Sequence, residues 1–425
     1  MNTRELKEAV QKGACDRSFS ALYGGENVER ARERYASAID TFVSIYGPKE
    51  EAFLLSVPGR SEISGNHTDH NHGRVIAASV DCDVIAVAAK EPDSLVRIKS
   101  DGYKEDTVDL QNLDPESYPR FRSCALVAGM CAAFRNDGRQ AGGLTAYTVS
   151  NVLKGSGLSS SAAFEVLIGV ILNDCFMTDK VSPIEIAQIG QWAENVYFGK
   201  PCGLMDQMAS SVGNIITIDF ADPAHPDVEP VAVDFSKAGL ALCILDSGAG
   251  HEDLTNEYSA ITNELRAVCR VFGKEVLREV PEEAFLAELP KVRAAAGDRA
   301  VNRAFHVYAE NRRALAEKEA LRQGDFDKFL ALVRESGRSS AMYLQNVIPT
   351  GSTAAQELMV TIALCERILE GRGAVRVHGG GFGGTAQAFV PLDMLDTFKK
   401  ATEAALGKDC CHVVMIRPAG GVRLG

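Results

Sequence analysis

A cluster of polar side chains separates two apolar stretches near residue 60. The stretch Phe53–Val57 precedes the cluster and the stretch Val75–Val80 follows it. The clustered residues are Arg60, Glu62, Asn66, His67, Asp69, His70 and His72. Together these side chain types can both donate and accept hydrogen bonds, which is what the hydroxyl groups of a polyol require. We therefore expect this segment to bind a neutral, polyhydroxylated ligand.

The histidines also permit a different interpretation. Their spacing, His67-x-x-His70-x-His72, is close enough for imidazoles on a loop to share a zinc ion. Metal-site histidines usually come with further ligands, and the neighbouring sequence holds no Cys pair or second acidic cluster. A zinc hydrolase stays an alternative, and it predicts stoichiometric zinc in the purified protein.

A glycine- and serine-rich segment, Gly155-Ser-Gly-Leu-Ser-Ser-Ser161, stands between an expected strand and an expected helix. Glycines allow close approach of the backbone to a ligand, and a helix start presents unpaired N–H groups. This pattern favours a phosphate cradle, in which one hydroxyl could also reach a magnesium ion. It is not a Walker A loop, because Lys154 precedes the glycines. The alternative is an ordinary loop with a Ser-rich helix cap.

Two carboxylates follow this segment. Glu194 lies on an expected helix and could be a solvated edge residue, which is the usual environment of Glu. Asp206 lies between Met205 and Met208 just after a Gly turn. An ionised group there needs a partner, and such carboxylates tend to be functional.

A late stretch, Gly379 to Gly384, contains the glycine spacing of a dinucleotide-binding loop. Such a loop must open a helix, whereas Thr385–Val390 alternates like a strand and runs into Pro391. We expect instead a tight glycine hairpin whose backbone packs against a ligand or another loop.

The elements that position these residues are of mixed type. Residues 1–50 are expected to be helical, and the strands are expected at Phe53–Val57, Val75–Val80, Val84–Ala89, Val96–Ile98, Leu144–Val152, Asn214–Phe220 and Leu240–Leu245. Further helices are expected over Arg122–Phe134, Phe164–Cys175, Ser182–Phe198, Ser259–Phe272, Val301–Ala320, Phe326–Ser336 and Ala354–Leu369. The Pro-rich stretch Ala221–Pro230 predicts a joint between domains.

Bulk composition bounds the class of protein. The 425 residues exceed one ordinary core, and 46% hydrophobic with 24% charged residues indicate a globular chain. A net charge of −12 argues against a nucleic-acid partner. The charged N-terminus and the short apolar runs predict no membrane span and a cytoplasmic location. Eleven scattered cysteines without a C-x-x-C pair are expected to be free and mostly buried.

Taken together, the motifs make the chain similar to the galactokinases of the GHMP sugar-kinase superfamily. Residues Gly59 to His70 resemble the family signature G-R-x-N-[LIV]-I-G-E-H-x-D-Y, and Gly155 to Ala162 match G-x-G-L-S-S-S-A. Residues Cys202 to Gln207 match C-G-x-M-D-Q, and Gly379 to Gly384 match the late G-G-G-F-G-G. The four motifs occur in the family's order over most of the chain.

The resemblance implies a function and a fold. The chain would transfer the γ-phosphoryl group of ATP to the C1 hydroxyl of galactose, with Mg²⁺ on the nucleotide. The fold would be α+β with two lobes, residues 1–225 with a mixed, ribosomal S5 domain 2-like sheet and a left-handed β-α-β crossover, and residues 226–425 with a ferredoxin-like sheet. The partners would be ATP and a sugar, without nucleic acid or membrane, and the oligomeric state stays open.

The resemblance also implies roles for single residues. Asp206 would be the base beside the anomeric hydroxyl, and Arg60 would be its electrostatic partner. Ser161 and Glu194 would bind the magnesium ion. The sugar contacts would be Asn66, His67, Thr68, Asp69, Tyr258 and Asp206. The ATP phosphates would lie on Gly155, Ser156, Gly157, Leu158, Ser159, Ser160 and Ser161.

Departures from the signature bear on the sugar. Glu62, Ser64, Asn66 and His70 replace the family's Asn, Ile, Glu and Tyr. In the family that Glu contacts hydroxyls near C6 of the sugar, so Asn66 substitutes a neutral contact and removes a negative charge. A kinase for galacturonate, arabinose or an N-acetylhexosamine is therefore an alternative, and a non-catalytic sugar and ATP sensor is another. The intact phosphate segment favours a kinase over a sensor.

Overall fold

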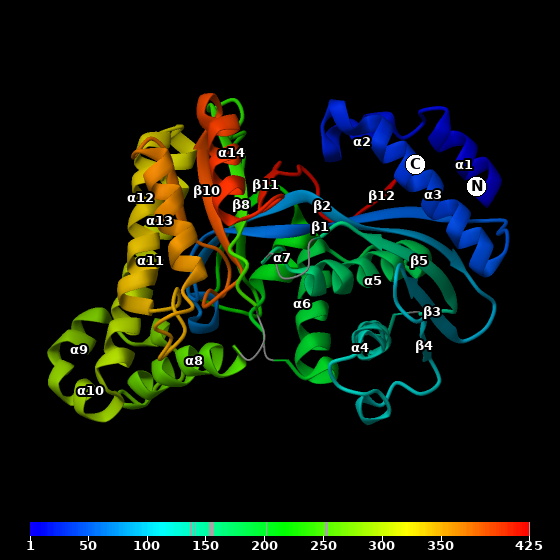
Figure 1. Cartoon of the computed structure of the whole chain (residues 1–425). Helices are drawn as coiled ribbons and strands as arrows, with labels where there is room; N and C mark the ends of the chain where they lie inside the picture. Colours follow the sequence, from blue (N-terminus) through cyan, green and yellow to red (C-terminus); the bar gives the residue numbers. More distant parts are fainter. Residues whose placement is uncertain (137, 140, 153–156, 201, 251–253, 425) are drawn as a thin grey trace.

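The chain folds around two β-sheets that lie side by side (Figure 1). The computed structural model describes residues 1–136, 138–139, 141–152, 157–200, 202–250 and 254–424. Buried apolar residues from both sheets belong to one continuous core, which joins Val57 and Ile76 to Ile244 and Phe389. Among the described residues, none of the helices is long and apolar enough to cross a membrane.

The first sheet has eight strands and is mixed. Its order is β12-β1-β2-β5-β3-β4, with β6 paired to β2 and β7 to β6. Strands β3 and β5 are parallel and the other pairs are antiparallel. The strands are β1 (Phe53–Ser64), β2 (Arg74–Lys90), β3 (Leu95–Ser100), β4 (Asp106–Asp109), β5 (Leu144–Ser150), β6 (Ile215–Asp219), β7 (Asp227–Val231) and β12 (Val422–Leu424).

Helices cover both faces of this sheet because its strands are apolar on both sides. Leu54 and Val87 pack under α1 (Thr3–Gln11), α2 (Asp16–Tyr23) and α3 (Val28–Tyr46). Leu55 and Val57, with side chains on the opposite face, pack against the other helices. These are α4 (Ser123–Asn136), α5 (Ser160–Phe176), α6 (Pro183–Ala193), the π-helix η4 (Glu194–Phe198) and α7 (Met205–Val212).

The second sheet is antiparallel, with the order β11-β8-β10-β9. In chain order this is 4-1-3-2, which confirms the expected ferredoxin-like sheet. Its strands are β8 (Leu240–Asp246), β9 (Ala374–Val377), β10 (Thr385–Pro391) and β11 (Cys411–Val414). The accompanying helices are α8 (Thr255–Arg270), α9 (Glu282–Ala287), α10 (Leu289–Ala296), α11 (Asp298–Gln323), α12 (Phe326–Ser339), the π-helix η6 (Ser340–Leu344), α13 (Glu357–Leu369) and α14 (Leu395–Leu406).

The structure corrects several expected element boundaries. Strand β1 runs on to Ser64, so Arg60 and Glu62 lie on a strand instead of a loop. The two runs expected as separate strands form the single strand β2. The register of β1 against β2 shifts between Pro58 and Arg60 and between Glu62 and Ser64. Such irregularities re-aim side chains and are common next to active sites.

Helices also differ in detail from the expectation. Ser182 caps α6 by accepting the backbone N–H of Glu185, as expected, but α6 ends at Ala193 and continues as η4. Helices α9, α10 and α14 were not expected from the sequence. The division at residue 225 stays a prediction; β7 and β12, which follow it in the chain, pair within the first sheet.

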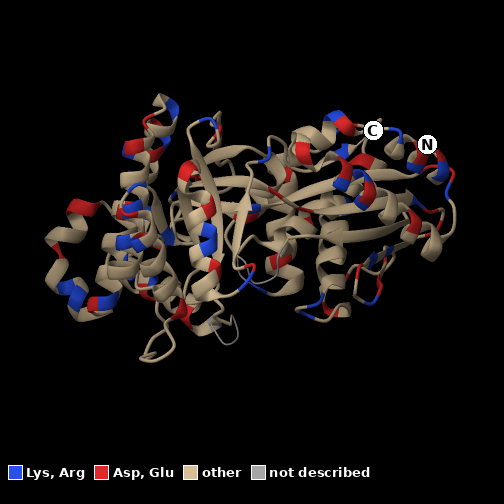
Figure 2. Ribbon diagram, turned by 45° about the horizontal axis from the view of Figure 1, so that its top comes forward, with Lys and Arg blue, Asp and Glu red and all other residues tan. Residues whose placement is uncertain are grey.

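Acidic and basic residues are mixed along the helices that Figure 2 shows. Figure 2 shows Lys and Arg interspersed with Asp and Glu along the outer helices at both ends of the molecule. The eleven cysteines are free thiols. Both observations agree with what the composition indicates.

Candidate active site

Arg60 and Asp206, which are 146 positions apart in the chain, form a bidentate ion pair. Arg60 Nε lies 2.6 Å from Asp206 Oδ1, and Arg60 Nη2 lies 2.8 Å from Oδ2. Ser159 donates its hydroxyl to the same Oδ2 at 2.7 Å. Burial alone would raise the pKa of Asp206, but the charge and hydrogen bonds of Arg60 and the Ser159 hydroxyl hold it below its ordinary value. Asp206 is therefore ionised at neutral pH.

The position of Arg60 is fixed by close packing of β1 against the glycine- and serine-rich segment. Arg60 is 6% exposed, and its backbone N–H donates to Leu158 O at 3.0 Å. Its Nη1 donates to the carbonyl of Gly157. A side chain at Gly59 would meet Leu158 O at 2.8 Å, so the absence of a Cβ there allows this approach.

The second half of the expected phosphate cradle opens a helix. Gly155 and Ser156 lie outside the described residues. Helix α5 begins at Ser160, four residues earlier than expected, so Ser160 and Ser161 occupy its first turn. Ser159 has a left-handed φ of +56° and makes no side-chain cap, because its hydroxyl contacts Asp206. The alternative of a Ser-rich cap is thus wrong for Ser159, and a helix N-terminus faces the Arg60–Asp206 pair.

Glu194 is buried rather than solvated. It is 2% exposed and begins the π-helix η4, a rare element that often marks functional sites. Gln207 Nε2 donates to Glu194 Oε2 at 2.9 Å and to Glu165 Oε2 at 3.0 Å. The Lys200 ammonium lies 3.6 Å from Glu194 Oε1, which has no hydrogen-bond partner in the described part of the chain.

These oxygens suit magnesium. A carboxylate oxygen free of hydrogen bonds and a serine hydroxyl, at Ser161 on the partly exposed first turn of α5, are hard oxygen ligands of the kind Mg²⁺ prefers. The described residues contain no cluster of three or more His, Cys, Asp or Glu that could hold a metal by itself, so the zinc alternative loses its support. Nucleotide-bound Mg²⁺, which keeps phosphate and water ligands, needs no such cluster.

Glu165 and Lys200, which the sequence motifs did not indicate, lie beside Glu194. Burial, and next the charge of Glu194, raise the pKa of Glu165 well above its ordinary value. Burial would lower the pKa of Lys200, but Glu194 and Asp206 raise it above its ordinary value, so this lysine is charged. The available signal for Glu165 was a single carboxylate inside an apolar helical run, one turn after Ser161.

The expected sugar segment folds into a turn closed by the 3₁₀-helix η2 (Asp69–Asn71). His67 Nε2 donates to Gly380 O at 2.9 Å, and burial lowers the pKa of His67 to about 4, so its ring is neutral. The Asp69 carboxylate packs against Gly203, where any Cβ would collide with it. Thr68 is fully buried, and its hydroxyl contacts Gly65 O and Arg74 O.

Asn66 is fully buried, and its amide is engaged by the protein. Its Nδ2 donates to Glu62 Oε1 at 2.9 Å and to Gly379 O at 2.7 Å, and its Oδ1 accepts from Asn346 Nδ2 at 2.8 Å. A carboxyl group absent at position 66 is present nearby at Glu62, which pairs with the buried Arg376 and whose pKa is raised by burial. A sugar contact by the Asn66 amide stays a prediction, and it would require these bonds to be exchanged.

The glycine hairpin between β9 and β10 is hydrogen-bonded to side chains of the sugar segment, Asn66 to Asp69. Its three successive carbonyls, Gly379, Gly380 and Gly381, accept hydrogen bonds from the side chains around them. Gly379 O accepts from Asn66 at 2.7 Å. Gly380 O accepts from His67 at 2.9 Å and from Asn346 at 3.2 Å. Gly381 O accepts from the Tyr258 hydroxyl at 3.1 Å. The expectation of a tight hairpin packed against another loop is confirmed.

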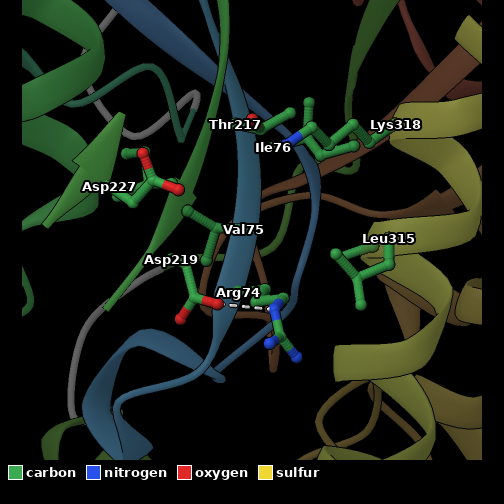
Figure 3. A pocket seen from close by; sticks show the side chains of 10 residues that line it. Arg74, Val75, Ile76, Thr217, Asp219, Asp227, Leu315 and Lys318 are labelled. Carbon is green, nitrogen blue, oxygen red and sulfur yellow. Dashed lines mark ion pairs between the residues drawn. The ribbon is translucent and has the colours of Figure 1, made fainter. Parts of the chain in front are cut away.

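A cavity of about 140 Å³ lies between β2, β6 and α11, and Arg74 at the start of β2 is part of its lining (Figure 3). Its cations are already paired: Arg74 Nε lies 2.7 Å from Asp219 Oδ2, and Lys318 Nζ lies 3.0 Å from Glu229 Oε2. We therefore assign the chemistry to the Arg60–Asp206 region and not to this cavity.

Comparison with known proteins agrees with this geometry. The family model described as "Galactokinase galactose-binding signature" matches residues 40–90, and "GHMP kinases N terminal domain" matches residues 125–214. The galactokinase of Glaesserella parasuis is 31% identical over 351 residues, which cover 81% of this chain and 86% of that protein. The structure of Lactococcus lactis galactokinase complexed with galactose is similar, with a TM-score of 0.77 and 27% identity over 92% of this chain and 99% of that one.

More distant structures share the fold alone. The mevalonate kinase of Methanococcus jannaschii has a TM-score of 0.60 at 14% identity, and the match covers 87% of this chain and 99% of that one.

Proposed function

Because the chain belongs to the galactokinase family of GHMP kinases, we propose that it transfers the γ-phosphoryl group of ATP to the C1 hydroxyl of galactose. The oxygen of the C1 hydroxyl forms the new bond to phosphorus, the bond from phosphorus to the bridging oxygen of ADP breaks, and the proton of the C1 hydroxyl leaves to Asp206. The products are galactose 1-phosphate and ADP. The observation that carries the proposal is the bidentate Arg60–Asp206 contact at the N-terminus of α5.

Asp206 is proposed to align the sugar hydroxyl and to take its proton. Its pKa lies below the ordinary value, so it is a weak base that is ionised before the reaction starts. A loose transition state chiefly requires alignment and charge neutralisation, and a fixed, ionised carboxylate meets the first requirement. Arg60 donates to both oxygens of that carboxylate and places a permanent positive charge next to the reacting groups.

The nucleotide is proposed to lie on Gly155 to Ser161, with its phosphates at the start of α5. Unpaired backbone N–H groups and the helix dipole favour an anion there. Ser161 and Glu194 would hold the magnesium ion, which supplies positive charge to the phosphate oxygens when bound. The charged Lys200 ammonium, 3.6 Å from Glu194 Oε1, adds a further positive charge next to the proposed magnesium site.

The sugar is proposed to lie between the segment Asn66 to Asp69 and Tyr258, against Asp206. The partly exposed members of this set are His67, Asp69, Tyr258 and Asp206. The remaining two, Asn66 and Thr68, are buried in hydrogen-bonded positions and would shape the segment's backbone.

A kinase for a related sugar is the second candidate, favoured by the engaged amide of Asn66. With that amide bonded to Glu62, Gly379 and Asn346, the site offers no free amide group at this position. An ADP-release assay over galactose, galacturonate, arabinose and N-acetylgalactosamine decides between them. We expect the highest kcat/KM for galactose. A clear preference for galacturonate or arabinose would show that this other sugar is the substrate.

The proposal includes the cytoplasm as the location. Free thiols persist in reducing compartments, and all eleven cysteines are free. The partners are then ATP and the sugar. The acidic net charge of −12 disfavours nucleic acid.

A further inference from the structure

Helix α11 contacts the backbone of residues 65–74, which include the sugar segment Asn66 to Asp69, at three separate points. This helix belongs to the part of the chain that builds the second sheet, whereas the sugar segment connects two strands of the first. In each contact a side chain of α11 meets a main-chain group. The contacts are His306 Nε2 to Asn66 O at 3.0 Å, Gly65 N to Glu310 Oε1 at 3.3 Å, and Arg74 N to Asn311 Oδ1 at 2.7 Å.

Two of these α11 side chains are themselves held rigidly. His306 is fully buried, and its Nδ1 lies 2.8 Å from Ser339 Oγ. Burial lowers the pKa of His306, so the ring is neutral. Because a carbonyl can only accept, the proton of the neutral ring lies on Nε2 and Nδ1 accepts the Ser339 hydroxyl.

Glu310 is fixed in the same way. It is fully buried, accepts the Ser336 hydroxyl at 2.6 Å on Oε1, and has Arg313 Nη2 3.1 Å from its Oε2. Burial alone would raise its pKa, but the positive charges of Arg313 and Arg376 and the Ser336 hydroxyl hold the pKa of Glu310 below its ordinary value, so it is an ionised acceptor for Gly65 N. A charged acceptor strengthens this contact.

The segment between these anchors is tightly closed. Gly65 has a left-handed φ of +92°, and any Cβ there would collide with Arg74 O. A Cβ at Gly73 would approach Asn311 Oδ1 to 2.5 Å. The two ends of the segment therefore touch each other, and α11 holds both ends.

From these contacts we infer that α11 is a positioning element for the sugar site. His306, Glu310 and Asn311 fix the backbone of residues 65–74, and thereby set where His67 and Asp69 stand relative to Asp206. None of the three is assigned a contact with sugar or nucleotide, so they act through the segment. The inference rests on the proposed function only for its kinetic consequence, because the backbone contacts exist without substrate.

Asn311 offers the sharpest test. It is half-buried, whereas His306 and Glu310 are fully buried, so its replacement is the least harmful of the three to folding. Asn311→Leu removes the acceptor of Arg74 N, whereas Asn311→Asp keeps an oxygen there. We expect Asn311→Leu to raise the KM for galactose about tenfold, the factor for one lost buried hydrogen bond. The KM for ATP should stay unchanged, and Asn311→Asp should stay near the native values.

A second readout does not need turnover. Hydrogen exchange followed by mass spectrometry reports the opening of residues 65–74, and Asn311→Leu should accelerate exchange in that peptide while the rest of the chain keeps its native pattern. Val307→Ala is the control: Val307 is buried on α11 in the apolar cluster beneath α8 and has no part in the three backbone contacts. This control removes apolar packing between α11 and α8 but leaves the three backbone contacts in place, so exchange in 65–74 should not accelerate.

The outcomes separate the inference from the proposed function. An unchanged galactose KM together with unchanged exchange in Asn311→Leu would overturn the inference. Equal acceleration in Val307→Ala would overturn it as well, because the effect would then be general loosening. If the native protein turns over none of the sugars, the proposed function fails, and the exchange comparison still decides the role of α11.

Discussion

The hydroxyl of Ser159 lies 2.7 Å from Asp206 Oδ2, which ties the residue before the first helical turn of α5 to the carboxylate proposed to lie beside the sugar. In the proposed reaction, this one hydrogen bond would connect the phosphate-binding residues to the residue that takes the hydroxyl proton. It also exists because Ser159 adopts a left-handed conformation that few residues other than glycine accept.

Replacing Ser159 by alanine should change the pH profile. The hydroxyl is one of the groups that hold the pKa of Asp206 below its ordinary value. Without it that pKa rises, so the acidic limb of the kcat/KM profile should move to higher pH. Ser160→Ala, one position along, is the matched control, and an identical shift in both variants would exclude the specific contact.

Asp206→Asn should lower kcat by about 10²- to 10⁴-fold, the usual contribution of a positioned general base. The asparagine keeps the shape of the side chain but cannot accept a proton from the C1 hydroxyl. ATP binding, measured by calorimetry, should stay close to native because Asp206 is assigned to the sugar. Turnover near the native rate would show that another group accepts the proton.

Gln207→Leu should weaken magnesium binding. The Gln207 amide is the donor that holds Glu194 Oε2 and Glu165 Oε2, at 2.9 and 3.0 Å. Loss of groups that orient a metal ligand typically costs about 10- to 100-fold in affinity. Binding of Mn²⁺ in the presence of ADP, followed by electron paramagnetic resonance, measures this directly. Gln188→Leu changes a partly exposed amide on α6 that contacts Ala224 O and neither carboxylate, and this variant should bind like the native protein.

Glu317→Gln should flatten the dependence of stability on pH. Glu317 is fully buried on α11, and burial followed by the charge of Glu310 raises its pKa to about 8. Its folded-state pKa is above the unfolded value of about 4.3, so the folded state binds one more proton between these values. The stability that this proton contributes is complete below about pH 4 and is lost as pH rises through about 8.

Urea unfolding at several pH values between 5 and 9 checks this expectation, with the native protein losing more stability toward pH 9 than Glu317→Gln. Glu319→Gln, an exposed neighbour on the same helix, is the control. Parallel curves for all three proteins would show that Glu317 does not carry the proton.

Local patterns in the sequence predicted candidate site residues more readily than the elements that hold them. Gly155 to Ser161 and Asp206 stand in recognisable motifs, and the alternation of β10 argued against a dinucleotide loop. The polar run from Arg60 to Ser64 was interpreted as a loop, yet it is a buried strand. Its charges are neutralised by Asp206 and Arg376, which lie far away in the chain, and no local pattern reveals such partners.

The same limit explains the other omissions. The role of Glu165 depends on its contact with Gln207 and on nearby Glu194, which lie on other helices. The roles of His306 and Glu310 depend on contacts with a segment about 240 residues earlier in the chain. Helices α9 and α10 have only six and eight residues, which is too short for a helical period to show in the sequence.

The row of hairpin carbonyls from Gly379 to Gly381 has a consequence for engineering new sugar preferences. Because these carbonyls accept hydrogen bonds from Asn66, His67 and Tyr258 in turn, an insertion or a bulkier residue in the hairpin would displace all three side chains together, and with them the sugar contacts proposed for His67 and Tyr258. Libraries that vary the hairpin and the signature segment together should therefore retain more folded, selective variants than libraries that vary either one alone.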